Sequence, residues 1–436
     1  MKKWISEKRG LLSLCAVAAV AFGLSGCVSN PTSSALSVGQ TSLYFGTSNW
    51  SGLNNISFAS GGVWSITLDP VTGFFSYNDV NRQPPVITGN TPFSGTLTTT
   101  PSGFLDLALS QGTTSGGYAV NLPGEGLLMR TNSSTTDIYG NSPSTLIAAT
   151  ISAACPAFTS AQTFNFVAQG TTVQGDPIVH VAYGSVQISP GSAATWSFSS
   201  LTMNDLSGNA LSPSPIPNAT CPPTQEGFVL VSPLTNSPYT PAQITTGISP
   251  SGLLVIDPGQ NEDAFGHLTV DITPTGPTGL MGVLKPSAAL NVSDMVGQKY
   301  AGFESDPLSP LGTIAVAFGS TPGTGTAITG GGFPGDDVTQ QPRADTTLDL
   351  GTQSTQTPGL FPSVTLTQPD TYDVCAGTPS AGTDSSGNPT CIYHGVAVAG
   401  QVNGKYVIFT NINDPTALNP TGATPLAVIN LALYQQ

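Results

Sequence analysis

The sequence feature that most constrains the fold is an alternation of apolar and polar residues with a period of two. Val63 to Asp69 (VWSITLD) places Trp64, Ile66 and Leu68 on one face, and His267 to Thr273 alternates in the same way. Because successive side chains of a β-strand point to opposite faces, the pattern predicts strands with one buried face. Further runs of this kind are FVLVS (228–232), TIAVAFG (313–319), SVTLTQ (363–368), KYVIFTN (405–411) and AVINLALY (427–434).

The segments between these runs are typical of turns. The chain has 50 glycines and 37 prolines among 436 residues, a share well above the usual one of about 12%. Asn403-Gly404 between two apolar runs predicts a type I′ hairpin. Only Thr145–Ala153 and Ser293–Lys299 have patterns that allow a helical turn or two. Gly62-Val63-Trp64 is similar to the G-x-W opening of lipocalin-like proteins, which implies a small antiparallel barrel.

We therefore expect an all-β protein with Gly- and Pro-rich loops and two antiparallel domains, each a β-barrel or a β-sandwich, at residues 43–238 and 239–436. The length after residue 42 exceeds what one hydrophobic core usually organises. Short segments recur in the same order in both halves, which suggests a tandem repeat, although similar composition would give the same impression. The matching segments are 179–185 with 314–320, 101–105 with 250–254, and 205–209 with 384–388.

The N-terminus has the pattern of an export signal. Four basic residues precede an apolar run from Leu11 to Gly23, which is too short to span a bilayer as a helix. The run ends in Leu24-Ser25-Gly26-Cys27, which resembles the lipobox of bacterial lipoproteins. The resemblance implies that residues 1–26 are removed and that Cys27 carries acyl chains. In Gram-negative members an aspartate after the cysteine retains the protein at the inner membrane, so Val28 favours the outer membrane.

Charge restricts the partners. The signal contains four of the ten basic residues and one of the 24 acidic ones, so the rest of the chain has six basic and 23 acidic residues. Such a chain cannot neutralise a row of phosphates or bind anionic headgroups by charge, which excludes nucleic acid as a partner. We expect the acyl chains on Cys27 to attach the protein to the membrane, and residues 27–42, small and polar, to form a lipidated, flexible tether.

Cysteine usage predicts disulfides. Cys15 lies in the signal and Cys27 is the lipidation site, so four cysteines remain: Cys155, Cys221, Cys375 and Cys391. An even number in an exported protein suggests two disulfides, with three possible connectivities. We favour Cys155–Cys221 and Cys375–Cys391, because each bond then stays within one half of the chain. A zinc site competes with this interpretation, but no C-x-x-C pair occurs.

Other polar clusters allow metal or phosphate chemistry. The candidate metal ligands are Asp257, Glu262, Asp263 and His267. Oxygen ligands on a turn suit Ca²⁺ and a histidine suits a transition metal, but the spacing matches no EF-hand, and a solvated hairpin loop is the alternative. Segments 205–209 and 384–388 resemble partial calcium loops, although Asp, Asn and Gly are also what β-turns require. The glycine-rich stretch 319–335 lacks the following helix and lysine of a phosphate loop, so we expect a mobile loop.

The sequence contains no recognised catalytic set. The motifs G-x-S-x-G, S-x-x-K and H-E-x-x-H are absent, so we assign no catalytic residue and expect no cofactor. We predict a cell-envelope lipoprotein with a non-enzymatic binding or surface-structural role, and a small apolar ligand, a glycan or an envelope protein as its partner. The alternative is an extracytoplasmic hydrolase of polysaccharide or another envelope polymer, which needs two converging carboxylates.

Overall fold

The computed structural model of the chain consists almost entirely of antiparallel β-strands, which confirms the predicted all-β class. It contains one closed barrel and two further large sheets, which we name sheets 1, 2 and 3 in chain order. The described residues are 42–48, 62–69, 72–82, 93–100, 102–109, 117–131, 145–151, 159–171, 179–190, 195–211, 219–220, 228–231, 243–257, 261–262, 268–269, 279–305, 313–332, 345–370, 375–414 and 427–436.

Sheet 1 is a closed barrel whose eight strands neighbour one another in chain order. Its last strand pairs with its first, for example at Ala149 and Gly46. Gly62 and Trp64 of the G-x-W tripeptide lie at the start of the second strand. The strands are β1 (Ser42–Ser48), β2 (Gly62–Asp69), β3 (Phe74–Arg82), β4 (Phe93–Thr99), β5 (Leu105–Leu109), β6 (Gly117–Leu122), β7 (Gly126–Thr131) and β8 (Thr145–Ile151).

In sheet 2, as in sheet 1, strands that follow one another in the chain lie side by side, apart from one short strand. Its strands are β9 (Gln162–Thr171), β10 (Val179–Pro190), β11 (Thr195–Asn204), β12 (Ala210–Leu211), β13 (Ala219–Thr220), β14 (Phe228–Val231), β15 (Gln243–Ile248), β16 (Leu253–Asp257) and β19 (Gly279–Leu284). The last strand, β19, pairs with β9, for example at Met281 and Val167. The short β12 pairs with β11. A separate two-stranded sheet is formed by β17 (Asn261–Glu262) and β18 (Leu268–Thr269).

Sheet 3 follows the helix α2 (Val292–Val296). Its strands are β20 (Tyr300–Ser305), β21 (Thr313–Phe318), β22 (Ala327–Gly331), β23 (Thr346–Asp349), β24 (Leu360–Pro369), β25 (Ala381–Thr383), β26 (Pro389–Val402), β27 (Lys405–Asp414) and β28 (Ala427–Gln435). The last strand again pairs with the first, β28 with β20. A bridge between Ala317 and Gly332 joins β21 to the end of β22. The glycine-rich stretch expected to be a mobile loop therefore contains a strand of sheet 3.

The grouping of the strands differs from the expected division at residues 43–238 and 239–436. That boundary falls between β14 and β15, which pair with each other in sheet 2. The pairing of the last strand of each sheet with its first, which local patterns do not reveal, places β14 and β15 in the same sheet. Most predicted strand segments lie in strands, and Ser293–Lys299 overlaps α2. The helical turn expected at Thr145–Ala153 is wrong, because residues 145–151 form β8, which closes sheet 1.

The interiors of sheets 2 and 3 are filled by side chains. Inside sheet 2, Phe164, Phe166 and Trp196 pack with smaller apolar residues. Inside sheet 3, Tyr300, Phe361 and other apolar side chains do so, and α2 adds Met295 and Val296 to the same cluster. In sheet 1, large apolar side chains alternate with those of the outer face and are likewise fully buried, namely Leu68, Phe75, Leu105, Leu107, Leu127 and Met129.

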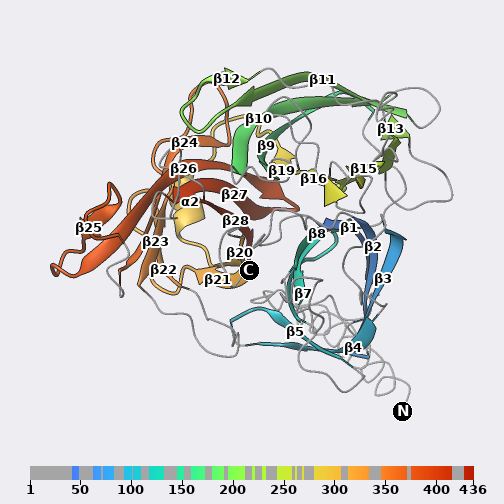
Figure 1. Ribbon diagram of the computed structural model, residues 1–436, viewed down its shortest axis with the longest axis horizontal. Helices are drawn as coiled ribbons and strands as arrows, with labels where there is room; N and C mark the ends of the chain where they lie inside the picture. Colours follow the sequence, from blue (N-terminus) through green and yellow to red (C-terminus); the bar gives the residue numbers. More distant parts are fainter. Residues whose placement is uncertain are drawn as a thin grey trace, which may run out of the picture.

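The outer faces of the three sheets meet in a separate apolar core, which we call the shared core. Sheet 1 contributes Val120, sheet 2 contributes Val167, and sheet 3 contributes Phe409, together with neighbours on the same faces. Phe104 and Phe303 join sheets 1 and 3 through an edge-to-face ring contact with centroids 5.7 Å apart. Figure 1 shows sheet 1 in blue to cyan, sheet 2 in green to yellow and sheet 3 in orange to red around the marked C-terminus.

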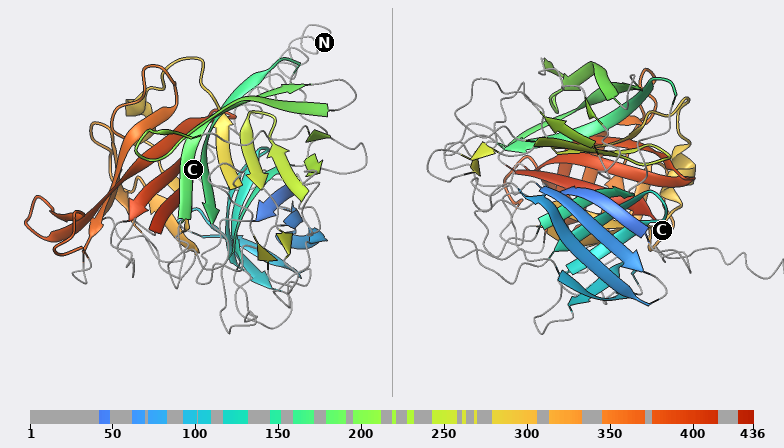
Figure 2. Two further views of the ribbon diagram at one scale, coloured as in Figure 1. Left: turned by 45° about the horizontal axis from the view of Figure 1, so that its top comes forward. Right: turned by 90° about the vertical axis from the view of Figure 1, so that its right-hand side faces the viewer.

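Polar contacts fix how the sheets dock. The buried amide of Asn411 on β27 donates from Nδ2 to the carbonyl oxygens of Ala168 and Ala182 in sheet 2, each at 2.9 Å. Between sheets 1 and 2, buried Glu125 accepts hydrogen bonds from the backbone N–H and the hydroxyl of Ser251, at 3.0 and 2.7 Å. Since an unpaired buried polar group is costly, these contacts favour one relative placement of the sheets. The two views of Figure 2 show the resulting three-part body.

Asn411→Ala is expected to lower the free energy of unfolding by about 1–3 kcal/mol, because two buried carbonyl oxygens lose their donor. Urea unfolding of the full chain measures this loss. Asn413→Ala is the matched control: Asn413 lies on the same face of β27 and is half-buried, its Oδ1 has no hydrogen-bond partner, and we expect a change of about 0.5 kcal/mol or less. Equal losses in the two variants would contradict the docking role of Asn411.

Candidate functional site

An open groove of about 830 Å³ lies where the strand ends of sheet 2 meet those of sheet 3. Its lining comes from the start of β9, from the end of β19 and the segment that follows it, from Pro358 just before β24, and from Gln401 near the end of β26. The polar lining residues are Gln162, Thr163, Lys285, Ser287 and Gln401, and the larger apolar ones are Leu284, Pro286, Leu290 and Pro358. Its volume is within the range of known ligand sites.

Two side-chain amides outside the lining hold the walls of this groove. Gln353 Oε1 accepts from the backbone N–H groups of Leu290 and Gly359, both at 3.0 Å, and its Nε2 donates to the Leu290 carbonyl at 3.2 Å. Asn165 Nδ2 donates to the carbonyl of Pro358 at 2.8 Å. These contacts join separate segments, so the groove is preorganised and does not depend on one loop.

The charge of the groove differs from that of the chain as a whole. Lys285 is its one charged lining residue, and the lining contains no Asp, Glu, His or Cys among the described residues. The Lys285 backbone N–H donates to the Thr163 carbonyl at 2.8 Å, which fixes where the side chain leaves the main chain. The groove therefore offers hydrogen-bond donors, hydroxyls and a cation, but no pair of acids or bases that could transfer a proton at neutral pH.

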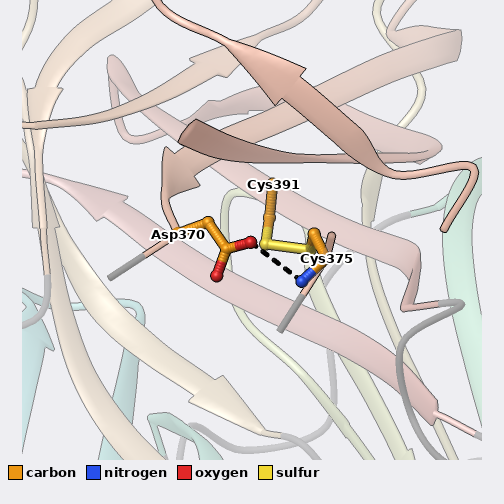
Figure 3. A group of neighbouring side chains, drawn as sticks. All are labelled: Asp370, Cys375 and Cys391. Carbon is orange, nitrogen blue, oxygen red and sulfur yellow. Dashed lines mark hydrogen bonds between the residues drawn. A yellow bond between two sulfur atoms is a disulfide. The ribbon is translucent and has the colours of Figure 1, made fainter. Parts of the chain in front are cut away.

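Figure 3 shows a small group of metal-ligand side chains beside sheet 3: Asp370 follows β24, Cys375 precedes β25, and Cys391 lies on β26. Asp370, Cys375 and Cys391 have ligand atoms within 4.8 Å of one another. The two sulfur atoms form a disulfide, and the Asp370 carboxylate accepts the Cys375 backbone N–H at 2.9 Å. Because the two sulfur atoms are bonded to each other, they are not thiolates that could bind a metal, and the group has a structural role. It confirms the predicted Cys375–Cys391 bond.

Most of the other predicted lipidation, disulfide and metal-site residues lie in segments that the structure does not describe. Cys27, Cys155 and Cys221 lie outside the described residues, as do Asp263 and His267. Asp257 ends β16 and Glu262 ends β17, and the proposed metal site stays a prediction.

The two five-residue segments with partial calcium-loop spacing form hairpin turns. Asp205 Oδ1 accepts the Asn209 backbone N–H at 2.8 Å and Oδ2 accepts the Asn209 side-chain amide at 2.8 Å. Asp384 binds Asn388 in the same way, at 2.7 and 2.8 Å. The asparagine side-chain hydrogen bond is the main cause that lowers the pKa of each aspartate. Because the turns themselves occupy these carboxylate oxygens, the geometry favours the turn interpretation over a calcium site.

The groove is the part of the site that sequence reasoning missed. Its lining comes from segments near residues 162, 285, 358 and 401, which no motif connects. The one available signal was Lys285, a rare basic residue in a strongly acidic chain.

Comparison with known proteins does not identify a family. No family model and no curated protein matches the chain. One similar solved structure is described as "The Structure of Intact Ap-TbpB (N and C lobes)"; it is 10% identical, the alignment covers 93% of this chain and 79% of that chain, and the TM-score is 0.23. A TM-score of this size does not establish a shared fold. Within the described ranges, no helix has the length and apolar character to cross a membrane.

Proposed function

We propose that this chain is a lipid-anchored, non-enzymatic binding protein of the bacterial cell envelope, in the outer membrane where the bacterium is Gram-negative. The folded part is a rigid platform of three sheets that presents the groove between sheets 2 and 3 to its partner. The acyl chains on Cys27 and the tether 27–42, both expected from the sequence, hold this platform at the membrane.

The observation that carries the binding role is the built groove. Its walls are clamped by Gln353 and Asn165, whereas the described interiors of sheets 2 and 3 are filled by their own side chains. A partner is therefore expected on the outside of the sheets and not, as a small apolar ligand would require, inside a barrel. The absence of carboxylates from the described lining gives the hydrolase alternative no support at this site.

Cys27→Ala is expected to move the protein from the membrane fraction to the soluble fraction and to abolish incorporation of labelled palmitate. Two or three acyl chains anchor stably, and an acidic protein has no other affinity for anionic lipid. Cys15→Ala is the matched control, because that cysteine lies in the predicted signal and its loss should change neither readout. A Cys27→Ala protein that stays in carbonate-washed membranes would contradict the proposed anchor.

The binding role is tested by photo-crosslinking in cells. Benzoyl-phenylalanine placed at Ser287 or Gln401, both exposed groove residues, is expected to give a discrete adduct. The same group at Ser207 or Ser386, exposed in the two hairpin turns, should give none. The proposed function fails if the groove positions label nothing, or label the same species as the turn positions.

A further inference from the structure

We propose that the groove binds an extended stretch of polypeptide that carries an acidic side chain, whose carboxylate pairs with Lys285. This inference rests on the proposed function and specifies the class of partner that the groove accepts.

The charge of the groove points to an anionic ligand. Only six basic residues remain outside the predicted signal, against 23 acidic ones, so most of the surface repels a carboxylate. The described lining of the groove has a lysine and no acid. Lys285 is half-buried, and a charge-assisted hydrogen bond to an ammonium gains strength where water is partly excluded.

The uncharged lining residues suit a peptide backbone. Gln162 and Gln401 each have a side-chain amide, whose C=O and N–H groups are the complement of a peptide N–H and C=O, and Gln162 Nε2 also donates to Ser160 Oγ at 3.4 Å. Ser287 and Thr163 add hydroxyl groups, and Pro286 and Pro358 give short apolar surfaces. A protein with a preformed groove of this kind binds a chain in an extended form with little ordering cost on its own side.

The same lining argues against a sugar. Carbohydrates stack their apolar faces on aromatic rings, and the described lining contains no Trp, Tyr or Phe. The openness of the groove also suits a chain that enters and leaves, more than a small molecule enclosed on all sides.

The test is selection of random heptapeptides displayed on phage against the full chain, followed by titration with the synthetic peptide that is most enriched. We expect the enriched sequences to share an Asp or Glu at one position. Lys285→Met should weaken binding of that peptide about fivefold, as an ion pair at a partly exposed site does. Added salt should weaken binding to the unchanged protein and have less effect on the variant.

Lys299→Met is the matched control, because Lys299 is exposed and lies outside the groove. It should leave the affinity unchanged, and circular dichroism should show that both variants keep the strand content of the parent. Replacing the peptide's acidic residue by its amide should reproduce the loss seen with Lys285→Met.

Three results would overturn the inference. No enrichment, or enrichment of peptides that lack an acid, removes the proposed ligand. Equal affinity in Lys285→Met removes the carboxylate contact. Binding to oligosaccharides on a glycan array that Lys285→Met abolishes assigns a glycan instead. In each of these cases, groove-specific crosslinks from Ser287 would still support a binding role. The absence of such crosslinks would contradict the proposed function itself.

Discussion

The shared core between the three sheets is the constraint on which the rest of the structure depends. Strands such as β6 are buried on both faces, with Ala119 in the barrel and Val120 against the neighbouring sheets. Such burial stabilises the assembly of sheets by the same apolar contacts that stabilise each sheet alone. The groove is a consequence, because its walls belong to two sheets and keep their spacing only while those sheets stay docked.

Much of the fold could be predicted from the sequence because strand formation is local. Burial of one face leaves a period of two, so the runs around Trp64 and Phe409 identify β2 and β27. Turn chemistry is local as well: Asn403 and Gly404 both have positive φ angles, 50° and 75°, as the predicted type I′ turn requires. The Cys375–Cys391 bond follows from cysteine number and proximity in the chain.

Ring closure and the groove were out of reach because they join distant segments. The pairs β19–β9 and β28–β20 connect strands more than 100 residues apart, and no alternation pattern specifies such partners. The alternation predicts one buried face for the run at Tyr406–Ile412, whereas the structure buries both of its faces, the second one in the shared core. Composition also misled at the glycine-rich stretch, where Gly331 lacks a side chain because the Phe318 ring occupies the place its Cβ would take.

The measurement that tests this account most directly is calorimetric unfolding of the full chain with exchange of backbone amides followed in each sheet. If the shared core joins the sheets, the chain unfolds in one transition, with equal calorimetric and van't Hoff enthalpies. Phe303→Ala then lowers the protection of sheets 1, 2 and 3 together, although the residue belongs to sheet 3. Separate transitions, or a loss of protection confined to sheet 3, would contradict the claim that the three sheets form one body.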